Sequence, residues 1–104
     1  MRKRRRLEWS PLAMSDRNAI FDYIEADSPR SAIIVDERIR ADIETLTRFP
    51  ASGRIGRVDG TRELVIRQTP YVAAYRLAGN TVRILRILHG AQRWPDDVDE
   101  DPTG

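Results

Sequence analysis

One histidine and a set of arginines are the residues of this sequence whose types and positions suggest chemistry. Arg62, Arg76, Arg83, Arg86 and His89 all fall in three strand-like segments in the second half of the chain. Histidine titrates near neutral pH, so it can accept a proton from an attacking 2′-hydroxyl or donate one to a leaving 5′-oxygen. Arginines can stabilise the charge that develops on the phosphate. These residues are therefore candidates for the cleavage of RNA.

A purely structural role is the alternative for the same residues. His89 can end a core strand with local hydrogen bonds, and strand arginines can pair with nearby acids. Because side chains alternate along a strand, we expect Arg83 and His89 on one face and Arg86 on the other. Glu63 alternates away from Arg62, so these two are not expected to form a catalytic pair. The aromatic residues can stack on bases but are more often packing residues: Trp9, Tyr23, Tyr71, Tyr75 and Trp94.

The composition argues against several other kinds of site. The chain has no cysteine, which excludes disulfides and thiolate metal sites, and a single histidine makes a zinc site unexpected. Neither a glycine-rich nucleotide loop before a helix nor a serine nucleophile motif is present, so we expect no metal and no cofactor. The basic start of the chain is not followed by a long apolar segment. We therefore expect no signal peptide and no membrane span, and predict a cytoplasmic location.

Charge is segregated along the chain, although the formal net charge is only +2. Residues 1–6 are strongly basic and residues 96–104 strongly acidic, and both are predicted to be disordered tails. Residues 7–95 are predicted to form one domain. Within it, residues 53–94 carry eight arginines against Asp59 and Glu63. The arginines predicted to bind RNA or a partner are Arg54, Arg57, Arg83, Arg86 and Arg93.

Two serine–proline pairs predict where two helices begin. In Ser10-Pro11 and Ser28-Pro29 the serine can cap the helix and the proline suits its first turn, which predicts helices over 11–26 and 29–48. The second helix carries an apolar stripe at helical spacing, made of Val35, Ile39, Ile43 and Leu46. The two helices should form an antiparallel hairpin with this stripe buried.

The rest of the chain has the pattern of a sheet. A short strand over 7–9 precedes the helices, a loop over 51–60 follows them, and strands are predicted over 62–66, 71–77 and 81–89. Gly79-Asn80 suits a hairpin turn, and the last strand has apolar residues on both faces, as a central strand does. The prediction is an α+β fold, with an N-terminal strand and a helical hairpin packed on a mainly antiparallel sheet whose other face is free to bind.

A series of short motifs resembles the RelE/ParE superfamily of toxins from bacterial type II toxin–antitoxin systems. The motifs occur in the same order and spacing across residues 7–95. They are Trp9-Ser10-Pro11, Asp22-Tyr23-Ile24, Phe49-Pro50 through Gly53-Arg54, Gly60-Thr61-Arg62-Glu63-Leu64-Val65, Tyr71-Val72 with Tyr75-Arg76, and Ile87-Leu88-His89-Gly90-Ala91-Gln92-Arg93-Trp94-Pro95. The resemblance implies the same helical hairpin on an antiparallel sheet. It also implies a growth-inhibiting toxin and a cognate antitoxin that forms a hetero-oligomer with it.

The resemblance leaves the cellular target open. The RelE-like branch cleaves mRNA in the ribosomal A site, and the positions that match its cationic and proton-transfer residues are Arg62, Arg76 and His89. Several active nucleases also carry a tyrosine near the C-terminus, whereas this chain has none after Tyr75. The ParE-like branch, which includes plasmid-stabilisation toxins, poisons DNA gyrase and needs no such residues. The histidine and arginines favour an mRNA interferase, with gyrase poisoning and a non-toxic antitoxin-binding module as alternatives.

The charge pattern suggests how the antitoxin is recognised. An acidic segment of the antitoxin would complement the arginines of residues 53–94 and cover the free sheet face.

Overall fold

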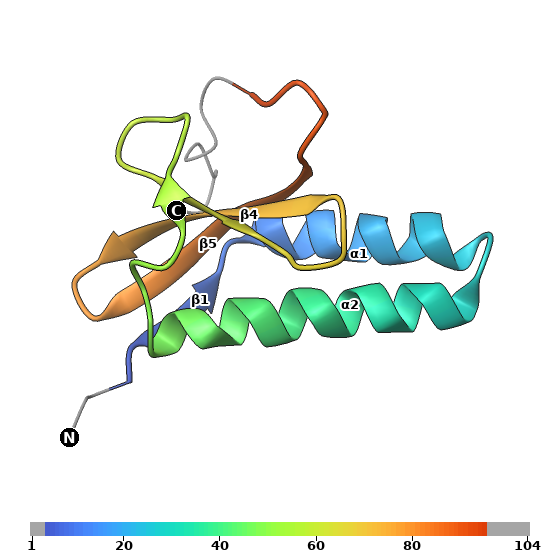
Figure 1. Ribbon diagram of the computed structural model, residues 1–104, viewed down its shortest axis with the longest axis horizontal. Helices are drawn as coiled ribbons and strands as arrows, with labels where there is room; N and C mark the ends of the chain where they lie inside the picture. Colours follow the sequence, from blue (N-terminus) through green and yellow to red (C-terminus); the bar gives the residue numbers. More distant parts are fainter. Residues whose placement is uncertain (1–3, 96–104) are drawn as a thin grey trace.

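The fold has two layers, a pair of antiparallel helices and a five-stranded sheet (Figure 1). The computed structural model of the chain describes residues 4–95, so the predicted acidic tail and residues 1–3 lie outside it. The elements are β1 (Arg6–Trp9), α1 (Pro11–Glu25), α2 (Pro29–Glu44), a 3₁₀ helix η1 (Thr45–Thr47), β2 (Arg54–Ile55), β3 (Arg62–Val65), β4 (Tyr71–Ala78) and β5 (Thr81–His89). The predicted α+β fold is confirmed.

Both helices begin where the serine–proline pairs predicted. The Ser10 hydroxyl oxygen accepts a hydrogen bond from the Ala13 amide at 3.0 Å, and Ser28 does the same for Ser31 at 3.2 Å. The end of the second helix differs from the prediction, because α2 stops at Glu44 and continues as η1. The hydroxyls of two threonines donate to carbonyls three residues before them, at 2.6 and 2.9 Å, and threonines that bond the backbone in this way disfavour a regular helix.

The sheet has the strand order β1-β5-β4-β3-β2. β1 runs parallel to β5, and all other neighbours are antiparallel. β5 therefore lies inside the sheet, as its apolar residues on both faces predicted. β2 falls within the segment predicted as a loop. β1 begins at Arg6 rather than Leu7, and the Arg5 amide donates to the Thr47 carbonyl at 2.9 Å, so residues 5 and 6 also contact the domain that was predicted to begin at residue 7.

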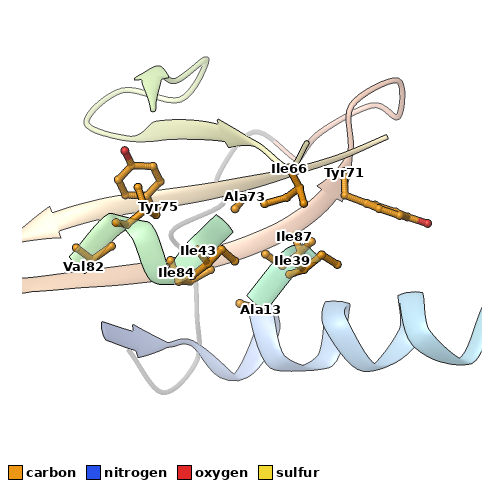
Figure 2. Close-up of a cluster of buried hydrophobic side chains, with 11 residues drawn as sticks. Ala13, Ile39, Ile43, Ile66, Tyr71, Ala73, Tyr75, Val82, Ile84 and Ile87 are labelled. Atoms are coloured by element: carbon orange, nitrogen blue, oxygen red, sulfur yellow. The ribbon is translucent and has the colours of Figure 1, made fainter. Parts of the chain in front are cut away.

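The main core lies between the helices and one face of the sheet (Figure 2). Ile39 and Ile43 of the predicted stripe are fully buried there against Ile84 and Ile87 of β5 and against Tyr75 of β4. The stripe of α2 therefore faces the sheet, as predicted. Among residues 4–95, neither helix has the length and apolar character that crossing a membrane requires.

The second face of the sheet also carries a small core. It buries two residues of β4 and two of β5 beneath Trp94, with Val58 packed at its side: Val72, Ala74, Leu85 and Leu88. The sequence predicted that this face is free to bind, and that prediction is wrong for the part that Trp94 and Val58 cover. Burying apolar side chains on both faces explains why β4 and β5 read as nearly continuous apolar runs.

Candidate functional site

The structure does not bring the three predicted catalytic residues together. Arg62 lies opposite Tyr75 in the β3–β4 register, and Arg76 is the next residue of β4, so its side chain points to the other face of the sheet. His89 lies opposite Tyr71, on the face of Arg62 but at the far end of β4. The expectation that these three residues face one surface is therefore wrong. Arg62 and Arg76 therefore start from opposite faces of the sheet, and His89 lies at the other end of β4 from both.

A bulge in β5 explains why alternation misplaced its side chains. Ala74 pairs with Arg86 and Tyr75 pairs with Ile84, which leaves Leu85 as an extra residue. The bulge reverses the alternation beyond it. Arg83 and Arg86 consequently start from the same face of the sheet and His89 from the other, the opposite of the predicted arrangement.

His89 is exposed at the end of β5 and its ring is held by local contacts. Its Nδ1 accepts a hydrogen bond from the Ala91 amide at 3.1 Å, and its own backbone amide donates to the Gln92 side chain at 2.8 Å. The ring of Tyr71 lies edge-on at 5.8 Å between centroids. Because Nδ1 is an acceptor, the neutral ring carries its proton on Nε2. Within residues 4–95, no charged side chain bonds the imidazole.

Glu63 organises two of the predicted partner-binding arginines. Its side chain is buried and accepts hydrogen bonds from Arg54 at 2.9 Å and from the side chain and amide of Arg57 at 3.1 and 2.8 Å. Burial opposes ionisation of this carboxyl, but the bonds from Arg57 and Arg54 outweigh it and lower the pKa of Glu63 below its ordinary value. Arg57 also stacks on Trp94, 3.7 Å from the ring centroid. The arginines are thus fixed on β2 and the following loop, half-exposed.

The two arginines of β5 are engaged in ion pairs with N-terminal elements. Arg83 pairs with Glu8 of β1, and Arg86 pairs with Asp16 of α1 at 2.7 Å. Asp16 also accepts the Ile87 amide at 2.9 Å, where β5 extends beyond the end of β1. The hydrogen bonds that the Arg86 guanidinium donates to Asp16 raise the pKa of Arg86. These contacts give Arg86 a structural role, and sequence reasoning did not identify Asp16 as its partner.

The remaining predicted residues lie elsewhere on the surface or in loop contacts. Arg93 is exposed after β5. The Arg62 guanidinium donates to the Gly53 carbonyl at 2.8 Å, and that of Arg76 donates to the Gly60 carbonyl at 3.2 Å. Among the five aromatic residues proposed to stack on bases, only Tyr23 is largely exposed; the others are buried or half-buried: Trp9, Tyr71, Tyr75 and Trp94. The packing interpretation therefore holds for those four.

Comparison with known proteins assigns the family. A family model described as the ParE toxin of the type II toxin–antitoxin system parDE matches residues 7–94. The chain is 41% identical over 92 residues to the toxin Y4kP of Sinorhizobium fredii, covering 88% of this chain and 95% of that protein. It is 37% identical over 84 residues to the toxin RelE2 of Caulobacter vibrioides, covering 81% of this chain and 93% of that protein.

A solved structure has the same fold. The chromosomal ParDE toxin–antitoxin system from P. aeruginosa includes a chain that superposes with a TM-score of 0.74 at 30% sequence identity, covering 82% of this chain and 95% of that chain. The helical hairpin on the sheet is therefore shared with a chain of a toxin–antitoxin system. The chain belongs to the ParE toxin family of type II toxin–antitoxin systems, within the RelE/ParE superfamily.

Proposed function

We propose that this toxin stops growth by binding and poisoning DNA gyrase, as the ParE-like branch does, and that it does not cut mRNA. The placement of Arg62 and Arg76 on opposite faces of the sheet carries the proposal. A nuclease must place its cations and its proton-transfer group around the same phosphate, and a residue on the far face cannot contribute. The match to the ParE toxin model over residues 7–94 supports the same branch.

Cleavage of ribosome-bound mRNA is the second candidate, and one observation favours it. His89 is exposed at the end of β5, and its Nδ1 accepts a hydrogen bond from the Ala91 amide. In this alternative the other ring nitrogen, Nε2, transfers the proton. A relative with the name RelE2 is 37% identical to this chain. In this alternative His89 works on the ribosome without Arg76.

Replacing His89 with alanine separates the two targets. We expect the variant to inhibit growth as strongly as the natural chain, because the proposed function involves no proton transfer. When the natural chain or the His89→Ala variant is mixed with gyrase and supercoiled plasmid, broken DNA should accumulate in both reactions. Primer extension on ribosome-bound mRNA should show no new cuts. Gln92→Ala is the matched control, since Gln92 contacts the His89 backbone and not its ring. If the natural chain cuts mRNA and His89→Ala lowers that rate about 10²–10⁴-fold, the gyrase proposal is wrong.

The proposed toxin also needs an antitoxin, and the exposed apolar residues of α2 are the surface we propose for it. Ile33 and Ile34 are exposed beside Ala41, and a cavity of about 620 Å³ separates them from Arg67 and Gln68 at the β3–β4 turn. An amphipathic helix of a partner can lay its apolar face in such a groove. This site replaces the sheet face that the sequence suggested, which Trp94 and Val58 partly cover.

A charge placed in this groove should weaken antitoxin binding. Ile34→Asp is expected to weaken the binding free energy of the toxin–antitoxin complex by about 2 kcal/mol or more. The reason is that a carboxylate would replace an apolar side chain at a contact buried in the complex. Calorimetric titration of the toxin with its antitoxin measures the change. Ile55→Asp is the control, since Ile55 is exposed on β2 away from the groove. If both variants weaken antitoxin binding equally, or if neither weakens it, the antitoxin binds elsewhere on the toxin.

A further inference from the structure

We infer that a cationic cavity around Phe49 binds single-stranded nucleic acid. The cavity has a volume of about 630 Å³, and the residues that line it are Arg5, Arg48, Phe49, Pro50, Ala51, Ser52 and Asn80. It lies where the start of β1, the end of α2 and the β4–β5 turn meet, at the left end of the molecule in Figure 1. His89 is at the opposite end of β5, so this cavity is separate from the site discussed above.

The loop that lines the cavity is held by hydrogen bonds from two side chains, Tyr75 and Arg62. Tyr75 is fully buried, and its hydroxyl donates to the Pro50 carbonyl at 2.7 Å and accepts the Gly53 amide at 2.9 Å. Arg62 donates to the carbonyls of Ala51 and Gly53 at 3.3 and 2.8 Å. A side chain at position 53 would lie 2.6 Å from the Tyr75 hydroxyl, so only glycine fits. The loop that presents Phe49 is therefore preorganised for binding.

The walls of the cavity carry arginines whose positions are fixed by the backbone. The Arg5 amide donates to the Thr47 carbonyl at 2.9 Å, and the Arg4 side chain reaches the Thr47 hydroxyl at 3.5 Å, which places Arg4 and Arg5 beside η1. Within residues 4–95, neither Arg5 nor Arg48 takes part in an ion pair. None of the residues that line this cavity is acidic, and Glu44 lines an adjoining cavity together with Arg4 and Arg48. The cavity is therefore cationic overall.

The exposed ring of Phe49 indicates nucleic acid as the ligand, in preference to an acidic peptide. The side chain is 56% exposed on the loop that Tyr75 holds, and it lines the cavity together with Arg5 and Arg48. Proteins that bind single strands combine a cationic groove, which follows the phosphates, with aromatic rings on which bases stack. Arginine is well suited to the phosphates because its planar guanidinium donates two parallel hydrogen bonds. An acidic peptide would use the arginines but has no base to place on the ring.

The inference does not depend on which target the toxin poisons. A single strand of DNA and a single strand of RNA both offer phosphates for the arginines and bases for the ring. Fluorescence anisotropy of labelled oligothymidine and oligouridine with the purified full-length chain distinguishes the two sources. We expect binding that weakens as salt is raised, with a logarithmic slope of about −0.7 for each phosphate contacted.

Two variants test the cavity itself. Phe49→Leu should weaken binding about 5- to 150-fold, the loss expected when one base no longer stacks, with the salt slope unchanged. Arg48→Gln should reduce the salt slope by about 0.7. Arg30→Gln removes the same charge from the far end of α2 and is the matched control, expected to change neither quantity. Thermal melts should be unchanged in all three because these side chains are exposed.

Three results would overturn the inference. The first is no binding of either oligonucleotide at low salt. The second is equal weakening by Arg48→Gln and Arg30→Gln, which would mean diffuse attraction to a basic protein. The third is binding of a polyglutamate peptide as tightly as the oligonucleotides with no loss in Phe49→Leu, which would assign the surface to an acidic protein.

Discussion

Replacing Ile43 with alanine is expected to lower the free energy of unfolding by about 2–5 kcal/mol, which is enough to unfold much of a domain this small. Ile43 is fully buried between α2 and the sheet, beside Ile84 and Tyr75 (Figure 2). The shortened side chain loses its transfer free energy and leaves a cavity that the rigid sheet cannot close. Urea denaturation followed by circular dichroism measures the loss.

Ile33→Ala is the matched control on the same helix. Ile33 is 62% exposed, so the same deletion should change stability by no more than about 0.5 kcal/mol. A loss of similar size in both variants would show that α2 does not pack on the sheet through the Ile39–Ile43 stripe.

Replacing Asp16 with alanine is expected to lower the free energy of unfolding by about 2–4 kcal/mol, which is more than an exposed ion pair contributes. The carboxylate takes two hydrogen bonds from Arg86, at 2.7 and 3.0 Å, and one from the Ile87 amide at 2.9 Å. Only 16% of the Asp16 side chain and 20% of the Arg86 side chain are exposed. Removing the carboxylate therefore leaves a largely buried guanidinium and a backbone amide without their partner.

A second ion pair provides the comparison. Glu37 and Arg40 pair on the exposed side of α2, and Glu37→Ala should change the free energy of unfolding by less than about 0.5 kcal/mol. Thermal melts of the two variants measure the difference. Equal melting temperatures would show that the bond between α1 and β5 contributes no more than a surface contact. The melting temperature of Asp16→Asn should lie between those of the two alanine variants, because asparagine keeps an acceptor for the Ile87 amide.

Local sequence signals predicted the helices closely. The serine–proline pairs located both helix starts, and the spacing of Val35, Ile39 and Ile43 identified the face that packs on the sheet. Both signals act within a few residues, so they do not depend on the rest of the fold. The end of α2 was less predictable, because the hydroxyls of Thr45 and Thr47 compete for backbone carbonyls in its last turn.

The faces of the strands were less predictable than the strands themselves. Alternation along β5 is reversed by the extra residue Leu85, and a bulge of this kind depends on the partner strand rather than on β5 alone. The side chains of Arg83 and His89 were therefore placed on one face when they lie on two. The second small core beneath Trp94 was missed for a similar reason, since it joins a loop and a C-terminal residue that are far apart in the sequence.

The candidate site illustrates the same limit. The sequence identified arginines in abundance, but which acid each one meets is decided by the fold. Asp16 is 70 residues from Arg86, so no local pattern joins them. Glu63 was correctly separated from Arg62 by alternation, yet its role in holding Arg54 and Arg57 appears only when β2 pairs with β3. Phe49 was part of a recognised motif, but its exposure comes from the loop that Tyr75 holds.

From the parallel pairing of β1 with β5 we expect an order in the events of folding. Arg6 aligns with Thr81, so within residues 4–95 the strand nearest the N-terminus pairs in the sheet only with the strand nearest the C-terminus. Bringing β1 and β5 together closes a loop that contains nearly the whole domain. The entropic cost of this closure is larger than that of a local hairpin, and a contact of this kind slows folding. The β4–β5 hairpin and the two helices can form early, whereas β1 and the arginines that precede it join the sheet late. The arginines beside η1 therefore reach their positions only when the toxin fold is complete.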